Sequence, residues 1–303
     1  MEVETIDLEF QGVRGGIAAY LVKGEGGHIL VETGPESTRE RLLAELARRG
    51  VAVADLKGVF VTHVHLDHAG AAGWFAAQGV PVHVHPRGAR HLVDPTRLVE
   101  SARGVYGDRF DVLWGGMVPA PEALVRPLAD GEGVEIAGLS VTARDTPGHA
   151  FHHHAFQIGG DLFPGDAAGA RLGGSGYLSV TSAPPQFHLE HTLASIDKLA
   201  SLAPERLFLT HYGAVPDPLA HLAAYRDAVE LNAEFVRQRV IEGMEGETLA
   251  VAYEAFQLEQ GFRLGLPSSA WPDYQAINGT AMCADGMRRF WQSRFAEGGG
   301  SQT

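Results

Sequence analysis

The first third of the chain alternates short apolar runs with stretches of helical periodicity. The apolar runs Ile17–Val22 and His28–Val31 are separated by a glycine-rich turn, which predicts a β-hairpin. From Ser37 to Arg49 the leucines recur on one helical face, and a glycine follows the last turn. The next predicted elements are a strand at Val59–Thr62, a helix at Asp67–Gln78 and a strand at Val80–His85. This alternation of strands and helices favours an α/β core.

The middle of the chain is richer in strands, and the end is helical. Short strands between glycines and prolines are predicted at Val134–Ile136, Leu139–Ala143, Ala155–Ile158 and Asp161–Phe163. A helix at Leu189–Leu202 and a strand at Arg206–Thr210 follow, and then helices at Leu219–Ile241, Glu247–Gln260 and Ala276–Arg294. We therefore predict a core domain at 1–215, a helical extension at 216–297 and a disordered tail at 298–303.

Charge and cysteine content restrict the environment and the partners. The 303 residues include 24 Lys and Arg against 37 Asp and Glu, for a formal net charge of −13. A strongly acidic protein repels nucleic acid and anionic membranes, so we expect neither as a partner. The single cysteine, Cys283, excludes an intrachain disulfide. The acidic N-terminus lacks the features of a signal peptide, and no apolar run is long enough to span a membrane. We expect a cytoplasmic protein.

The most informative segment is Thr62-His63-Val64-His65-Leu66-Asp67-His68-Ala69-Gly70. In an extended chain, side chains two residues apart point the same way, so His63 and His65 can bind one metal ion together. Asp67 and His68 then occupy the first turn of the predicted helix. Isolated burial of four such groups would cost several kcal/mol each, so the cluster predicts a metal site. Imidazole and carboxylate ligands suit Zn(II), Fe(II) or Mn(II).

Three more candidates follow short predicted strands. They are His149 in Pro147-Gly148-His149, Asp166 in Gly165-Asp166, and His211 in Thr210-His211-Tyr212. Polar residues at the ends of strands in an α/β sheet commonly build functional sites. A single histidine after a strand is more often a structural residue than a ligand. The three gain weight only in the company of the His63–His68 cluster.

Together these motifs resemble the metallo-β-lactamase fold superfamily, in the same order and at similar spacing, over roughly residues 10 to 215. The resemblance implies a four-layer αβ/βα sandwich, in which residues 1–215 would be the catalytic domain. It also implies two divalent metal ions, most often zinc, with iron and manganese as alternatives. One metal would be held by His63, His65 and His149, the second by Asp67, His68 and His211, with Asp166 bridging the two.

The resemblance further implies hydrolysis by a hydroxide held between the metals. Asp67 could orient this nucleophile or relay its proton. Tyr212, which adjoins His211, and Tyr177 are candidates to donate a hydrogen bond to a substrate oxyanion, although a structural role is equally open for each. The family pattern usually has an aspartate at the end of the second strand, where this chain has Glu32. This departure leaves the support of the ligands open.

Other histidines favour structural interpretations. His152, His153 and His154 are adjacent, so their side chains cannot all point into one site, although one of them could reach it. His83 and His85 share one face of their predicted strand, and we interpret them as structural. The aromatic residues of the helical extension could form its core, line a substrate wall or build a homodimer interface.

The leading functional hypothesis is hydrolysis of an ester, thioester or lactone bond in a small molecule. Lactonases that resemble this family commonly have a tyrosine soon after the bridging aspartate, and none follows Asp166 directly here. The same metals could instead hydrolyse a phosphodiester or nucleic acid, which the acidic charge disfavours. Some relatives hold one iron and oxidise persulfides, but the presence of His68 and His211 favours two metals. A non-enzymatic metal-binding protein is the remaining alternative.

Overall fold

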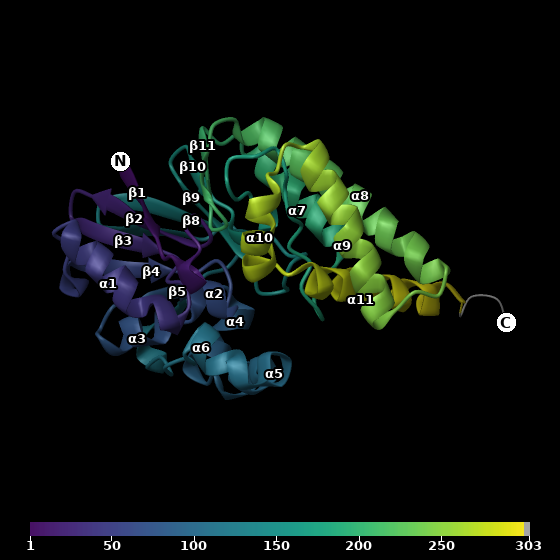
Figure 1. Cartoon of the computed structure of the whole chain (residues 1–303). Coiled ribbons are helices and arrows are strands. Elements are labelled where there is room, and N and C mark those ends of the chain that lie inside the picture. Colours follow the sequence, from purple (N-terminus) through teal and green to yellow (C-terminus); the bar gives the residue numbers. More distant parts are fainter. Residues whose placement is uncertain (300–303) are drawn as a thin grey trace. The chain divides into compact units, whose positions relative to one another are not determined.

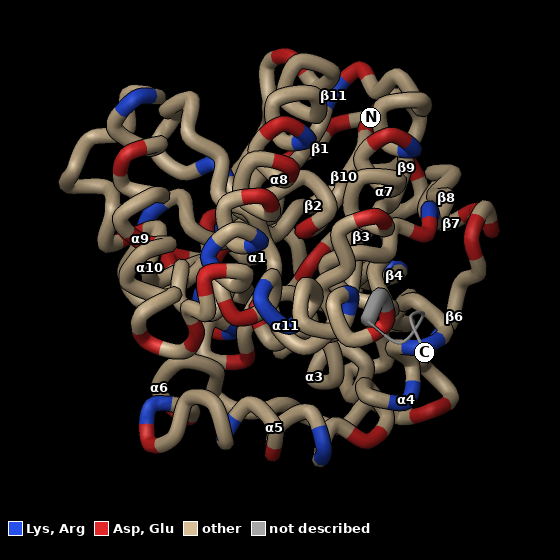
Figure 2. The backbone as a smooth tube through the Cα atoms, turned by 90° about the vertical axis from the view of Figure 1, so that its right-hand side faces the viewer, with Lys and Arg blue, Asp and Glu red and all other residues tan. Residues whose placement is uncertain are grey.

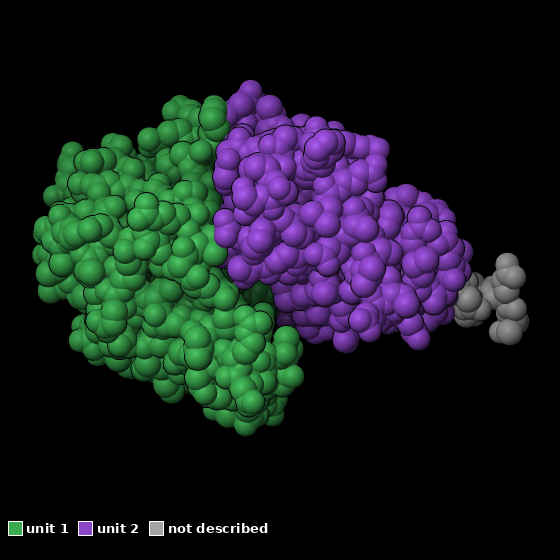
Figure 3. Space-filling view, viewed as in Figure 1, with its two compact units in different colours: residues 1–145, 152–165, 205–216 green, residues 146–151, 166–204, 217–303 purple. Residues whose placement is uncertain are grey.

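The computed structural model describes residues 1–299 as backbone and the side chains through residue 297 (Figure 1). Two compact units divide this chain (Figure 3). Unit 1 comprises residues 1–145, 152–165 and 205–216, and unit 2 comprises residues 146–151, 166–204 and 217–303. The predicted boundary near residue 215 coincides with the last point at which the chain passes from unit 1 to unit 2. That residues 1–215 form a domain of their own stays a prediction.

Unit 1 contains a first six-stranded mixed sheet with strand order β1-β2-β3-β4-β5-β6. Its strands are β1 (Glu2–Asp7), β2 (Ala18–Gly24), β3 (Gly27–Val31), β4 (Leu56–Phe60), β5 (Val82–Val84) and β6 (Val125–Pro127). β1, β2 and β3 pair antiparallel, and β3, β4, β5 and β6 pair parallel. The carboxyl ends of β3 and β4 therefore meet at one edge, which brings the residues that follow them together.

A second six-stranded sheet in unit 1 has the order β12-β11-β10-β9-β8-β7. Its strands are β7 (Gly133–Ile136), β8 (Leu139–Asp145), β9 (His154–Ile158), β10 (Asp161–Phe163), β11 (Arg206–Leu209) and β12 (Gly213–Val215). Only β10 and β11 pair parallel within it. The strands predicted for the middle of the chain and at Arg206–Thr210 are confirmed.

Apolar side chains from both sheets form one buried core in unit 1. Tyr20 and Phe60 of the first sheet belong to the same cluster as Phe156, Phe163 and Phe208 of the second. The rings of Phe163 and Phe208 stack with centroids 5.1 Å apart, and Tyr20 meets Phe163 edge to face at 5.4 Å. Burial of such rings contributes roughly 1.5–3 kcal/mol each, so this core fixes the strand ends that carry the polar motifs.

The helices of unit 1 are α1 (Arg39–Arg48), α2 (Leu66–Ala69), α3 (Ala72–Ala77), α4 (Pro86–Val93), α5 (Thr96–Tyr106) and α6 (Phe110–Trp114). Contacts join α1 to β1, α3 to β5 and α4 to β6. The helix predicted at 67–78 is divided into α2 and α3. The backbone N–H of Ala71 donates to the carbonyl of Gly34 at 3.1 Å instead of continuing the helix. Helices α4 to α6 have no counterpart among the predicted elements.

Unit 2 contains α7 (Leu189–Ser201), α8 (Pro218–Ile241), α9 (Gly246–Arg263), α10 (Trp271–Ile277) and α11 (Thr280–Gly299). Asp217 caps α8 by accepting the N–H of Ala220 at 3.0 Å, and Pro218 supplies the first helical residue. Helix α11 packs against α8 and α9, and α7 packs against α8. The predicted helical extension is confirmed. Of the predicted tail, 298–299 belong to α11, and 300–303 lie outside the described residues.

Charged residues of both signs are interspersed along the described chain (Figure 2). Among the described helices, none is both long and apolar enough to cross a membrane. The two mixed sheets with their accompanying helices confirm the predicted α/β class.

A first prediction concerns His83, a buried residue of β5 whose ring stacks on Phe60 with centroids 4.3 Å apart. Burial, with a further contribution from Arg126, lowers the pKa of His83 from 6.5 to about 4. Between these two values the unfolded chain binds more protons than the folded chain, so stability present above pH 6.5 is lost as the pH falls toward 4. The contribution is up to about 1.4 kcal/mol per pH unit.

The variant His83→Phe keeps a ring on Phe60 and cannot titrate. Its free energy of unfolding, measured with urea at several pH values, should fall less steeply between pH 6.5 and 4 than that of the wild type. Other titrating residues are common to both proteins and cancel in the difference. Parallel pH profiles for the two proteins would contradict the assignment.

Candidate metal centre

The junction between β4 and α2 gathers four ligand-type side chains of unit 1. After Phe60 the chain runs through a buried segment, and His65 precedes α2 with an extended backbone. The ring centroids of His63 and His65 are 4.5 Å apart, and those of His63 and His68 are 4.0 Å apart. The strand-to-helix turn therefore brings these rings together, as the spacing of the motif predicts.

The carboxylate of Asp67 lies against two imidazole rings. Its Oδ2 is 3.4 Å from Nε2 of His68 and 3.4 Å from Nε2 of His211, which follows β11. Burial raises the pKa of Asp67, but protons on the adjacent rings of His68 and His211 lower it more by charge and hydrogen bonding, so the net shift is well below the ordinary value. Asp67 is therefore ionised in this environment.

A second carboxylate and imidazole pair lies in unit 2. His149 follows β8 and Asp166 follows β10, and both side chains are buried. Nε2 of His149 is 3.4 Å from Oδ2 of Asp166. This pair repeats the arrangement of Asp67 with its two histidines.

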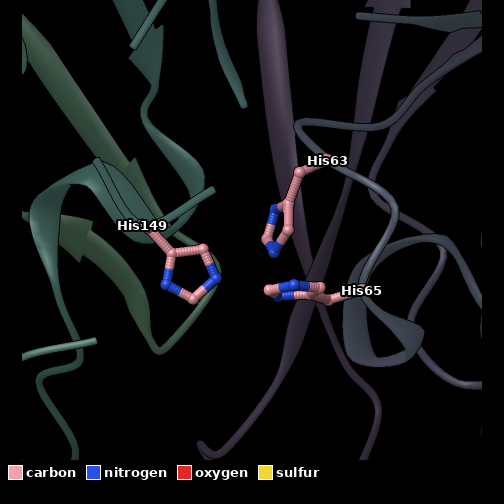
Figure 4. A group of neighbouring side chains, drawn as sticks. All are labelled: His63, His65 and His149. Carbon is pink, nitrogen blue, oxygen red and sulfur yellow. The ribbon is translucent and has the colours of Figure 1, made fainter. Parts of the chain in front are cut away.

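Three groups of ligand-type side chains contain all seven predicted ligands, and in each group the ligand atoms lie within 4.8 Å of one another. The groups are His63, His65 and His149, then His63, His68 and Asp166, and finally Asp67, His68 and His211. Figure 4 shows the first group, with its three rings as neighbours.

Hydrogen bonds on the opposite ring nitrogen determine which nitrogen of each histidine is available to a metal. Nδ1 of His211 lies 3.0 Å from the carbonyl oxygen of Gly16, and Nδ1 of His149 lies 3.0 Å from that of Thr181. Carbonyl oxygens only accept hydrogen bonds, so each Nδ1 carries the proton. In the neutral ring the Nε2 atom then holds the lone pair.

Glu32 fixes the position of the ring proton in His68 directly and in His63 through Thr62. Nδ1 of His68 donates to Glu32 at 2.9 Å, so its Nε2 also carries the lone pair. The hydroxyl of Thr62 donates to Glu32 at 2.5 Å, and its oxygen accepts from Nδ1 of His63 at 3.1 Å. One buried carboxylate thereby sets the tautomers of two histidines.

These tautomers place lone pairs and carboxylates opposite one another. Nε2 of His68 and of His211 faces Asp67, and Nε2 of His149 faces Asp166, each at 3.4 Å. Where these imidazoles are neutral, their nitrogen lone pairs and the carboxylates repel one another at this separation, and a cation between them, a proton or a divalent metal, removes the repulsion. A divalent metal with nitrogen and oxygen ligands satisfies this donor set. The residues therefore fit the metal that the motifs imply.

Glu32 supports the ligands despite being longer than the expected aspartate. It is 1% exposed, and besides His68 and the Thr62 hydroxyl it accepts the backbone N–H of Thr62 at 3.2 Å and the hydroxyl of Thr210 at 3.3 Å. Its backbone is left-handed, with φ of 65°. A non-glycine residue there costs of order 1 kcal/mol. From this backbone the carboxylate of Glu32 reaches Thr62, His68 and Thr210.

The two candidate tyrosines differ in their surroundings. The hydroxyl of Tyr177 is buried and donates to Gln257 at 2.7 Å, which supports the structural interpretation. Tyr212 is half-buried, and burial together with Asp7 and Glu9 raises its pKa. Its hydroxyl is therefore protonated at neutral pH and able to donate. Its catalytic role stays a prediction.

A further group, His85, Asp145 and His154, also has ligand atoms within 4.8 Å of one another. Nδ1 of His85 accepts the N–H of Arg87 at 2.9 Å, so the proton is on Nε2, which donates to Asp145 at 3.1 Å. This proton would have to leave before a metal could bind. Nε2 of His154 hydrogen-bonds the Leu128 carbonyl at 2.9 Å. These contacts support the structural interpretation of His85.

The neighbouring histidines lie closer to the motif than the sequence indicated. The ring of His153 is 4.9 Å from that of His63, and the ring of His152 is 5.7 Å from that of His65. Gly165 explains part of this packing, because a Cβ atom there would lie 2.8 Å from Nε2 of His153. Both rings thus pack around the proposed ligands, whereas His154 points to Leu128.

Comparison with known proteins identifies the family. A family model described as the metallo-beta-lactamase superfamily matches residues 12–211. The chain belongs to this superfamily. Members of the metallo-beta-lactamase superfamily are generally metal-dependent hydrolases, and the match includes all seven predicted ligands. The αβ/βα fold class predicted from the motifs is confirmed.

Similar proteins include a metallo-beta-lactamase fold-containing protein of Sulfurisphaera tokodaii, 26% identical over 199 residues, which are 63% of this chain and 73% of that protein. Human metallo-beta-lactamase domain-containing protein 1 is 48% identical over 61 residues, which are 20% of this chain and 23% of that protein. The solved structure of a metallo-beta-lactamase family protein from Thermus thermophilus has a TM-score of 0.67 at 23% identity, and the match covers 97% of this chain and 94% of that one. This last likeness shows the fold alone.

A second prediction concerns the carboxylate of Glu32. Glu32→Gln keeps the reach of the side chain but removes the charge that polarises His68. Glu32→Asp shortens the side chain by about 1.5 Å on a backbone adapted to glutamate. We expect each change to weaken the affinity of the His68 site for Zn²⁺ about 10–100-fold, as measured by competition with a chromogenic chelator.

Glu45→Gln is the matched control, because Glu45 is also a buried glutamate of unit 1 but pairs with Arg48 of α1 and with Arg49, which follows that helix. It should bind Zn²⁺ as the wild type does. Wild-type affinity in Glu32→Gln would show that this carboxylate does not support the metal ligands.

Proposed function

We propose that this protein is a dinuclear metal-dependent hydrolase that cleaves an ester, thioester or lactone bond of a small molecule. The observation that carries the proposal is the gathering of imidazole and carboxylate ligand atoms, which lie within 4.8 Å of one another in each of three groups, with Nε2 atoms 3.4 Å from the carboxylates of Asp67 and Asp166. Membership of the metallo-beta-lactamase superfamily supports hydrolysis as the reaction class.

In this proposal each metal has three ligands of its own and one shared ligand. His63, His65 and His149 would hold one ion, and Asp67, His68 and His211 the other, with Asp166 between them. When bound, such ions act as Lewis acids and lower the pKa of coordinated water toward about 7. Zinc suits this set of imidazole and carboxylate ligands best, and iron or manganese could replace it.

The protein's own groups would handle the proton and the oxyanion. The ionised carboxylate of Asp67 can orient the nucleophile by accepting a hydrogen bond from it, or relay its proton. Tyr212 follows His211 in the chain, and its protonated hydroxyl can donate a hydrogen bond to the oxygen that gains charge in the transition state.

The charge distribution supports a small substrate. The net charge is −13, and the basic positions of the described chain are interspersed with acidic ones (Figure 2). A nucleic-acid substrate is normally held by a cluster of Lys and Arg. A cytoplasmic location and a homodimer formed through the helical extension accompany the proposal as predictions. Side chains such as Phe262 on α9, 83% exposed, would contribute to that interface.

The third prediction tests the metals. Purified protein should contain about two metal ions per chain by elemental analysis, and His65→Ala and Asp166→Ala should each bind metal more weakly and lose activity by more than about 100-fold, because ligands matter more than their supports. His85→Ala is the matched control, since His85 is also buried in unit 1 but engages Arg87 and Asp145. Equal turnover by wild type and the Asp166→Ala variant would refute catalysis by this site.

The bond cleaved is the subject of the fourth prediction. A panel of chromogenic esters, thioesters, lactones and phosphodiesters should show turnover in one of the first three classes, abolished in His65→Ala. Turnover confined to phosphodiesters would replace the proposed substrate class with the alternative. Two bound metals without turnover of any hydrolysable substrate would favour a non-enzymatic metal-binding protein.

A further inference from the structure

A short buried segment of unit 2, Ser179–Ser182, contacts both proposed ligands of that unit. We call this segment the strap. The carbonyl of Thr181 accepts the Nδ1–H of His149 at 3.0 Å, and the hydroxyl of Thr181 donates to the backbone carbonyl of Asp166 at 2.7 Å. One residue of the strap therefore sets the ring of His149 and holds the backbone of Asp166.

Thr181 is in turn held by Tyr225 of helix α8. The Thr181 hydroxyl hydrogen is used on Asp166, so in the 3.1 Å contact between hydroxyls it is Tyr225 that donates. The Tyr225 oxygen also accepts the backbone N–H of Thr181 at 3.4 Å. The tyrosine ring is fully buried, and a Cβ atom on Gly169 would lie 2.2 Å from it. The hydroxyl therefore has little freedom to move away from Thr181.

The rest of the strap is attached to the end of the helical extension. The amide of Asn278 donates to Ser179 Oγ at 2.8 Å and to the Val180 carbonyl at 3.0 Å. The Ser182 hydroxyl donates to the carbonyl of Cys283 at 3.1 Å. Helix α11 approaches so closely that a Cβ atom on Gly286 would lie 1.8 Å from the carbonyl oxygen of Ser182. These hydrogen bonds and close contacts restrict the movement of the strap.

The backbone near His149 is held separately by α7. The carbonyl of Pro147 accepts the hydroxyl of Ser195 at 2.6 Å, and the carbonyl of Gly148 accepts the N–H of His188 at 2.8 Å. Loss of the Tyr225 hydroxyl would therefore leave the His149 loop in place. Removal of this hydroxyl would instead change the orientation of the His149 ring and the position of the Asp166 backbone.

We propose that Tyr225 is a positioning residue for the metal centre, acting through Thr181 on His149 and Asp166. The inference rests on the proposed function, because positioning matters only if these two residues bind a metal. It assigns to the helical extension a role in metal binding: a hydroxyl on α8 determines how well two ligands are pre-oriented. Ligands whose supporting hydrogen bonds are removed typically bind metal about 10–100-fold more weakly.

The test compares Tyr225→Phe with Tyr253→Phe. Tyr253 is also fully buried in the extension, and its hydroxyl donates at 2.6 Å to Asn232, which is not a strap residue. Zn²⁺ affinity is measured by competition with a chromogenic chelator, and thermal unfolding of the metal-free proteins is measured in parallel. Both variants should unfold at a lower temperature, but only Tyr225→Phe should lose affinity, by about tenfold for at least one zinc equivalent. Tyr253→Phe should stay within about twofold of the wild type.

Thr181→Val is a second variant, which keeps the carbonyl and removes the hydroxyl, and it should weaken zinc binding as Tyr225→Phe does. Wild-type affinity in both Tyr225→Phe and Thr181→Val would overturn the inference while leaving the proposed function intact. Equal losses in Tyr225→Phe and Tyr253→Phe would also overturn it, because the role would then be structural only. A wild-type protein that binds no Zn²⁺ would overturn both proposals.

Discussion

The arrangement of the site depends on one buried carboxylate, that of Glu32. It lies at the end of β3, where the parallel pairing with β4 brings it beside the Thr62–His68 segment. A buried carboxylate is tolerated only when hydrogen bonds replace its hydration, and here Thr62, His68 and Thr210 supply them. Because Glu32 accepts hydrogen bonds, Thr62 and His68 must donate them. The proton on Nδ1 of His68 and of His63 is fixed in this way, and the opposite nitrogen of each ring faces the site.

Much of the candidate site could be predicted from the sequence, because its chemistry is concentrated in side chains at strand ends. His63, His65, Asp67 and His68 are adjacent in the chain, and the period of a strand followed by a helix turn brings them together. Asp166 and His211 could be chosen as candidates because each comes directly after a short apolar run. The first hairpin, most strands of the second sheet and the helices of the extension were also predictable. Residues that face a core are apolar, and they recur with the period of the strand or helix that carries them.

The supporting contacts could not be predicted, because many of them use atoms that every residue has. The carbonyls of Gly16 and Thr181 orient His211 and His149, and no sequence pattern marks a carbonyl as an acceptor. The left-handed backbone of Glu32 is likewise unmarked, since the residue is not a glycine. The division of the helix predicted at 67–78 depends on a hydrogen bond to Gly34, a residue far from it in the chain.

Each unit orients its own ligands by its own contacts. In unit 1, Glu32 and the Gly16 carbonyl fix the proton on Nδ1 of His68 and His211. In unit 2, the strap does the same for His149. Since both sets hold Nδ1 by a hydrogen bond and turn Nε2 toward the carboxylates, an incoming metal does not have to reorient these rings. Binding free energy that is not used to reorient a ring remains as affinity, and for this reason we expect contacts remote from the ligands, such as that of Tyr225 with Thr181, to affect metal binding.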